Sequence, residues 1–187
     1  MERREPVAAP APAGGPLLGH LLAVAVAVLG GLLGIAGAFV GEVRSANFLL
    51  LPFLGAPIIE EVFKPAGVYL LLIRWPHLLR GRLHTAALAA LAGLAFGLVE
   101  AVVYITVYVS EPSGWFVVYR FSLPLVLHTT ASFIVGLGIN QGLLAWVRGG
   151  SPMPKASRNL YVAAIALHAA FNITATALAW SGVLNVD

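Results

Sequence analysis

The sequence lacks cysteine altogether and has few charged residues. Without cysteine, the 187-residue chain forms no disulfides, thiolate metal sites or thiol nucleophiles. Charged side chains make up only 10% of the residues, against about 25% in a typical soluble domain. Hydrophobic side chains make up 59%, and the mean hydropathy is +0.90. A water-facing surface needs charges that are missing here, so the composition predicts an integral membrane protein in contact with the lipid bilayer.

The distribution of the basic residues indicates a membrane topology rather than a nucleic-acid-binding surface. The formal net charge is +3, from 11 Lys and Arg against 8 Asp and Glu. Most of the basic residues lie in the N-terminal tail and in the 74–84 and 148–158 loops. The positive-inside rule therefore places the N-terminus in the cytoplasm and the C-terminus outside. We expect no nucleic-acid partner.

Long apolar runs predict an all-α, polytopic transmembrane helical bundle of about five spans. We expect these spans at about 17–41, 48–73, 85–109, 115–147 and 160–183. The fourth run is long enough to tilt or to begin as an interfacial segment, and Pro57 is a candidate break in the second. Residues 1–16 read as a flexible cytoplasmic tail, and 17–187 as a single transmembrane domain without an internal repeat.

Ionisable residues inside these runs are the functional candidates, because each costs about 2.5–3.5 kcal/mol to insert. They are Glu60, Glu61, Lys64, Glu100, His128 and His168, with the neutral Asn172 beside them. At ~1.5 Å per residue, the glutamates at 60 and 100, both histidines and the asparagine lie roughly 14–21 Å from the outer ends of their spans. Four helices therefore bring polar groups to one layer near the middle of the membrane.

Spacing and charge refine this cluster. Glu60 and Lys64 share one helix face, as do His168 and Asn172, because each pair is four residues apart. Glu61 is rotated by about 100° from its neighbour, so at least one of the two glutamates is oriented by other residues rather than aimed at a substrate. We expect Lys64 to pair with Glu60 or Glu100.

Three carboxylates face one lysine in this layer, so the excess negative charge must be neutralised. Protonated carboxyl groups, imidazolium and a divalent cation all meet this need, and the residues leave the three open. Two histidines with a carboxylate also form a zinc ligand set with a fourth position open for water. If a metal is present, the expected ligands are His128, His168 and Glu100.

Four motifs follow one another along consecutive spans. They are EExxK at 60–64, FxxxE at 96–100, His128 followed by Gly136, and HxxxN at 168–172. Together they resemble the PrsW family of intramembrane proteases, which is related to the CAAX prenyl endopeptidases and the bacteriocin-immunity-type membrane proteases. The resemblance covers about residues 55–175. A CAAX-type relative would have FxxxH at the second motif, so Glu100 favours the PrsW branch.

The resemblance implies hydrolysis of a peptide bond in a membrane-protein or peptide substrate, such as a single-span anti-sigma factor. It implies Glu60 as the general base, with Glu61 and Lys64 orienting it. His128 would hold the attacking water or a Zn²⁺ ion. The two residues of the HxxxN motif would stabilise the oxyanion, and Glu100 would be a metal ligand or a second acid.

Two other classes compete with this interpretation. Buried Glu, Lys and His also form proton or ion relays in transporters, although the chain has few helices and no repeat for such a fold. An inactive scaffold that binds partners through glycine-rich helix faces is the third reading, against which the catalytic-type residues argue. The Ala- and Gly-rich usage suggests a prokaryotic cell membrane.

Overall fold

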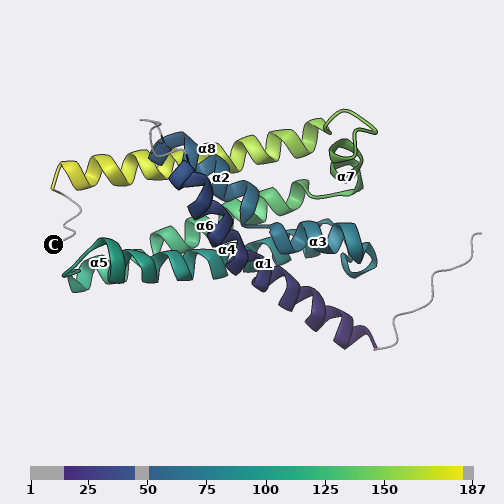
Figure 1. The fold of residues 1–187 in the computed structure, drawn as a ribbon, viewed down its shortest axis with the longest axis horizontal. Helices are drawn as coiled ribbons and strands as arrows, with labels where there is room; N and C mark the ends of the chain where they lie inside the picture. The colour runs from purple at the N-terminus through teal and green to yellow at the C-terminus, as the bar shows by residue number, and fades with distance from the viewer. Residues whose placement is uncertain (1–14, 45–50, 183–187) are drawn as a thin grey trace, which may run out of the picture.

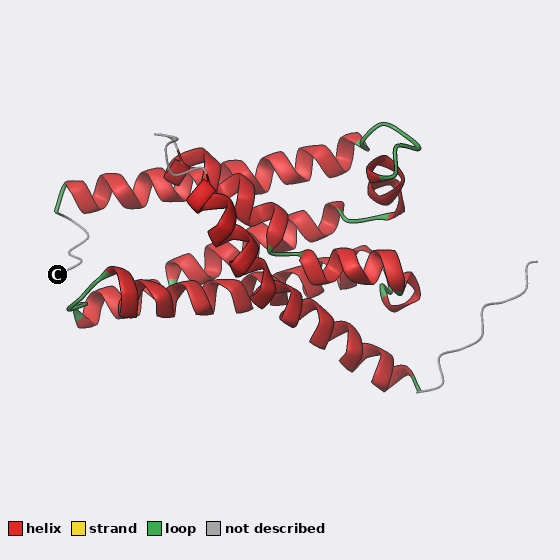
Figure 2. Ribbon diagram, viewed as in Figure 1, coloured by secondary structure: helices red, strands yellow, loops and turns green. Residues whose placement is uncertain are grey.

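The computed structural model describes residues 15–44 and 51–182, and the regular structure within these ranges is helical (Figure 2). Most of the expected tail, residues 1–14, lies outside the described ranges. The prediction of an all-α membrane bundle is confirmed.

Within the described ranges, four helical stretches are long and apolar enough to cross a membrane: Pro16–Val40, Arg82–Tyr108, Gly114–Gly138 and Lys155–Trp180. They comprise α1 (Pro16–Arg44), α4 (Arg82–Val103) with its π-helical extension η3 (Tyr104–Tyr108), α5 (Gly114–Arg120) with α6 (Leu123–Gly138), and α8 (Lys155–Trp180). These stretches correspond to the first, third, fourth and fifth expected runs.

The fourth run is shorter than the sequence suggests. Helix α6 ends at Gly138, and the rest of the run forms a separate short helix, α7 (Gln141–Val147). Asn140 starts this helix by accepting a hydrogen bond from the Leu143 backbone N–H at 3.1 Å. An N-cap of this kind satisfies a donor that a new helix leaves unpaired, so Asn140 separates the two segments.

The second run is broken into pieces that are each too short to cross a membrane. It consists of the π-helical turn η1 (Leu51–Gly55), α2 (Ala56–Phe63) and α3 (Ala66–Arg74), followed by the 3₁₀ turn η2 (Pro76–Leu78). Pro57 lies where the π-helical turn η1 passes into α2, and the backbone stays helical through this junction. The break falls at Lys64–Pro65 instead, so the expected break at Pro57 is displaced by eight residues along the chain.

Helix α4 packs along α6, α6 packs against α8, and α1 crosses the bundle obliquely over α3 and α4 (Figure 1). Small residues allow the crossing: a Cβ added to Gly67 of α3 would lie only 2.9 Å from the Cα of Ala27 in α1. Close backbone approach of this kind is how membrane helices associate.

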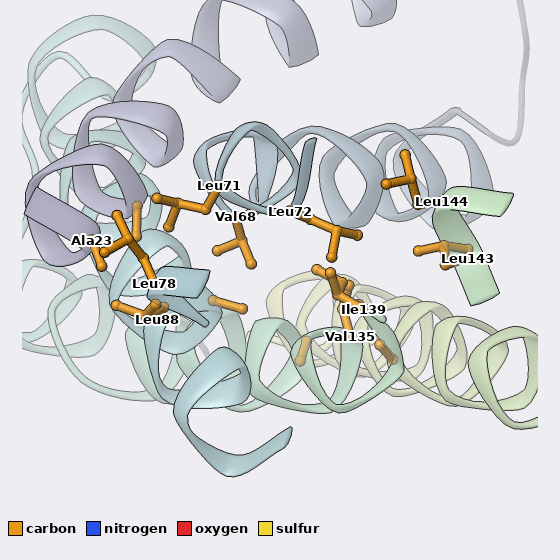
Figure 3. Packing of buried hydrophobic residues seen from close by; sticks show 14 residues of the cluster. Ala23, Val68, Leu71, Leu72, Leu78, Leu88, Val135, Ile139, Leu143 and Leu144 are labelled. Carbon is orange, nitrogen blue, oxygen red and sulfur yellow. The ribbon is translucent and has the colours of Figure 1, made fainter. Parts of the chain in front are cut away.

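The apolar core is centred on α3, α6 and α7 and extends to α1, α4 and α8. Val68, Leu71 and Leu72 of α3 are buried in one cluster with Val135 of α6 and with Ile139, which directly follows α6 (Figure 3). The start of α1, the α3–α4 connection, α7 and the start of α8 all lie at one end of the bundle (Figure 1). The basic loops therefore share one side, as the expected topology requires.

Candidate active site

Glu60, His128 and His168 meet in the interior from three different helices, α2, α6 and α8. Glu60 Oε2 lies 3.8 Å from His128 Nδ1 and 3.8 Å from His168 Nε2. One ligand atom from each of the three side chains lies within 4.8 Å of the others. All three residues are buried, so the structure brings together side chains that are distant in the sequence.

A second carboxylate orients each histidine from behind. His168 Nδ1 lies 2.8 Å from Glu61 Oε1, and His128 Nε2 lies 2.5 Å from Glu100 Oε2. Because an ionised carboxylate only accepts hydrogen bonds, these two ring nitrogens carry the protons. The opposite nitrogens, His168 Nε2 and His128 Nδ1, then face Glu60 with free lone pairs. Three acceptor atoms therefore surround one point.

Two buried cations neutralise part of the acidic charge. Lys64, which is fully buried, places Nζ 2.7 Å from Glu61 Oε1 and 3.1 Å from Glu60 Oε2. Arg120, at the end of α5, places Nη2 3.3 Å from Glu100 Oε2. Lys64 thus pairs with Glu60, as expected, and also with Glu61.

Sequence reasoning misses Arg120. This residue lies inside the fourth apolar run and is buried in the structure, so the signal that identified the other ionisable residues applies to it as well. Its position near the start of that run made it look like a charge at the membrane surface. With Arg120 counted, three carboxylates face two cations and two neutral imidazoles, which leaves a single negative charge.

The donor set fits a divalent metal ion. Two imidazole nitrogens and one carboxylate oxygen form a common zinc ligand set, and each ligand histidine typically donates its other N–H to a carboxylate. A tetrahedral zinc ion holds its ligand atoms roughly 3.3–3.5 Å apart. Glu60 Oε2 lies 3.8 Å from each histidine nitrogen, and all three atoms lie within 4.8 Å of one another, so a modest side-chain movement brings them to these distances. His128 Nδ1 is buried and has no hydrogen-bond partner among the described residues, as a vacant ligand atom would be.

The comparison with known proteins gives one match. A family model described as PrsW family intramembrane metalloprotease matches residues 13–186, nearly the whole chain. The chain belongs to this family. Neither a curated protein nor a solved structure matches it.

PrsW membership makes this chain an integral membrane protease that acts on a membrane-protein or peptide substrate in the bilayer. The transporter reading is not favoured. The four helices that could span a membrane agree with this assignment, and the family's description as metalloproteases agrees with the Glu60, His128 and His168 group.

The two carboxylates near His128 lie on opposite sides of its ring. Glu100 contacts Nε2, whereas Glu60 lies on the Nδ1 side, where the group of Glu60, His128 and His168 forms. The expectation that Glu100 is a metal ligand or a second acid stays a prediction. Asn172 lies one helical turn beyond His168 on α8 and is half-buried.

Proposed function

We propose that Glu60 Oε2, His128 Nδ1 and His168 Nε2 hold one Zn²⁺ ion, and that this PrsW-family protein uses it to hydrolyse a peptide bond of a membrane protein. The supporting observation is the convergence of three acceptor atoms beside the Lys64 ammonium, which lies 3.1 Å from Glu60 Oε2. Lone pairs that face one another repel, so this arrangement needs a cation or a water molecule at its centre.

When bound, zinc polarises the attacking water and the substrate carbonyl. The ion pairs of Glu60 with described residues all go through Oε2, which makes Oε1 the proposed acceptor of the water proton. Glu61 and Glu100 hold the two imidazoles in the tautomers that present lone pairs to the centre. Asn172 supplies an amide donor for the oxyanion of the tetrahedral intermediate.

The proposed substrate is a single-span membrane protein of the anti-sigma-factor type in a prokaryotic cell membrane. The motif resemblance supports this choice of substrate. Burial of the site supports a reaction within the bundle, since His128 and His168 are each only 2% exposed. Hydrolysis at this position requires the substrate segment to leave the lipid and reach the polar layer between α2, α6 and α8.

The test combines metal analysis with proteolysis in liposomes that contain a single-span peptide. We expect about one zinc per wild-type chain, and its loss in the His128→Ala/His168→Ala double variant. Glu60→Gln should reduce cleavage by about 10²–10⁴-fold, as expected for loss of a general base. Glu111→Gln is the matched control, because Glu111 is exposed in the α4–α5 connection.

Circular dichroism first establishes that each variant is folded. Full cleavage by Glu60→Gln would exclude the proposed role of this carboxylate. An active wild-type protein purified without chelator that contains no zinc would exclude the metal site, and would favour a water activated by Glu60 between the two imidazoles.

A further inference from the structure

The two histidines of the site are held by matching chains of contacts. On one side, Lys64 contacts Glu61, which accepts from His168 Nδ1. On the other side, Arg120 contacts Glu100, which accepts from His128 Nε2. Each imidazole is therefore followed by a carboxylate and then by a buried cation. The EExxK motif contains the first cation, whereas no motif contains the second.

We propose that Arg120 is a positioning residue of the active site, which fixes His128 through Glu100. The proposal rests on the proposed zinc site, because His128 Nδ1 is one of its ligand atoms. Glu100 Oε2 contacts His128 Nε2 and Arg120 Nη2 at once. The guanidinium thus holds the carboxylate oxygen at the place where it receives the imidazole proton.

The surroundings of Arg120 fix its guanidinium in turn. The Cζ atom lies 3.6 Å from the centroid of the Tyr104 ring, a close cation–π contact. Tyr104 follows Glu100 by four residues, so both lie on the same face of the α4 region. Arg120 therefore joins the end of α5, just before His128-bearing α6, to that face. A planar guanidinium stacks on an aromatic ring in a way that an ammonium group cannot.

Glu100 needs this support more than Glu61 does. The Glu100 side chain is 23% exposed, whereas that of Glu61 is fully buried beside Lys64. A partly exposed carboxylate has room to rotate towards water, and such a rotation would release Nε2 of His128. The ion pair with Arg120 opposes this rotation, because moving Glu100 Oε2 away would leave the buried guanidinium uncompensated.

The experiment is a double-mutant cycle on zinc affinity, measured by competition with a chromogenic chelator. Arg120→Met and Glu100→Gln should each raise the zinc Kd by about 10–100-fold, the usual cost of losing an outer partner of a metal-bound histidine. The zinc Kd of the double variant should not exceed the higher of the two single-variant Kd values, because both changes disrupt one chain of contacts. Arg158→Met, at an exposed position at the start of α8, is the matched control and should leave the Kd unchanged.

Arg120→Lys keeps the charge but loses the planar group that stacks on Tyr104, and should give an intermediate Kd. This variant also serves if Arg120→Met does not fold. A wild-type Kd in folded Arg120→Met, with a raised KM for substrate, would overturn the proposal in favour of direct substrate binding. Multiplicative effects of the two single changes would overturn it as well, because they would make Arg120 independent of Glu100.

A second readout uses the metal-free protein. The melting temperatures of the same four proteins should show the same non-additivity without zinc, because the contacts exist before the metal binds. Absence of zinc from the wild type with this coupling retained would refute the proposed metal site and support the link between Arg120 and Glu100. Zinc binding by the wild type with additive melting shifts would refute the positioning role alone.

Discussion

Lys64→Met tests whether the buried lysine stabilises the bundle by compensating the acidic pair. Lys64 is fully buried, and its ammonium lies 2.7 Å from Glu61 Oε1 and 4.9 Å from the centre of the Phe96 ring. Methionine has a similar length and no charge, so the change removes the ion pairs while the side-chain volume is largely kept. Breaking a buried pair by removing one partner costs about 3–5 kcal/mol. We expect Lys64→Met to lose folding stability in that range.

A compensating change separates charge from packing. Glu61→Gln removes the carboxylate charge, and its amide oxygen still accepts a hydrogen bond from His168 Nδ1. The double variant Lys64→Met/Glu61→Gln should therefore recover more than half of the stability that Lys64→Met loses. Recovery stays incomplete, because Glu60 also lies 3.1 Å from the lysine and keeps its charge.

Equilibrium unfolding in mixed detergent micelles, followed by circular dichroism, measures both free energies on the same protein. Arg158→Met is the matched control, because it removes a cation from an exposed position and should change stability by less than about 0.5 kcal/mol. The reasoning is refuted if Lys64→Met is as stable as the wild type. It is also refuted if the double variant is less stable than the sum of the single changes.

Two further variants probe the surroundings of the site. Gly97→Ala should lower the cleavage rate by about 10–100-fold while the protein stays folded, because its added Cβ would lie 2.9 Å from His128 Cδ2 and displace the ring. Gly114→Ala is the control in the same liposome assay. A Cβ at this position has no atom within 4 Å, so this variant should cleave like the wild type. Tyr161→Phe should cost about 0.5–1.5 kcal/mol of unfolding free energy, since it removes a hydroxyl 2.6 Å from that of Tyr69. A loss of cleavage rate by the folded variant would contradict this purely structural role.

Much of the site could be predicted because polar residues are rare within the apolar runs. Each ionisable side chain at membrane depth needs a partner, and the partners of Glu60 are confined to the few other polar groups at the same level. These groups belong to four motifs on consecutive spans. Their similar depth in the membrane predicts that they meet. Arg120 was not predicted as a site residue, because basic residues near the end of a span commonly lie at the membrane surface.

The division of labour between the carboxylates could not be predicted. Whether Glu60 or Glu100 faces the two histidines depends on how α2 and α4 are rotated about their axes, and on which nitrogen of His128 each one meets. These are properties of packing between helices and are absent from the spacing along any one helix. Both glutamates satisfied the same rules of depth and charge, and only the tertiary contacts separate them.

The break in the second span shows the same limit. Pro57 and Pro65 both lack a backbone donor, and either one is compatible with a helix that stops and restarts. Pro57 does not end the helix, because the π-helical turn η1 passes into α2 at this residue. Where a helix begins inside a protein is set by its neighbours, so the sequence identified a breakable segment but placed its break eight residues too early.

The broken segment also bears on how the protein is made. Neither α2 nor α3 has the length to cross a bilayer, and α2 carries two glutamates three and four residues before Lys64. On insertion scales, three such groups cost roughly 7.5–10.5 kcal/mol when they enter lipid unpaired. Lys64 pairs with both glutamates within the segment, and their further partners are His168 on α8 and His128 on α6. Because α8 follows 51–74 by about eighty residues in the sequence, this segment acquires its full set of polar contacts only after α8 has been synthesised. We therefore expect stable membrane integration of this segment to depend on α8.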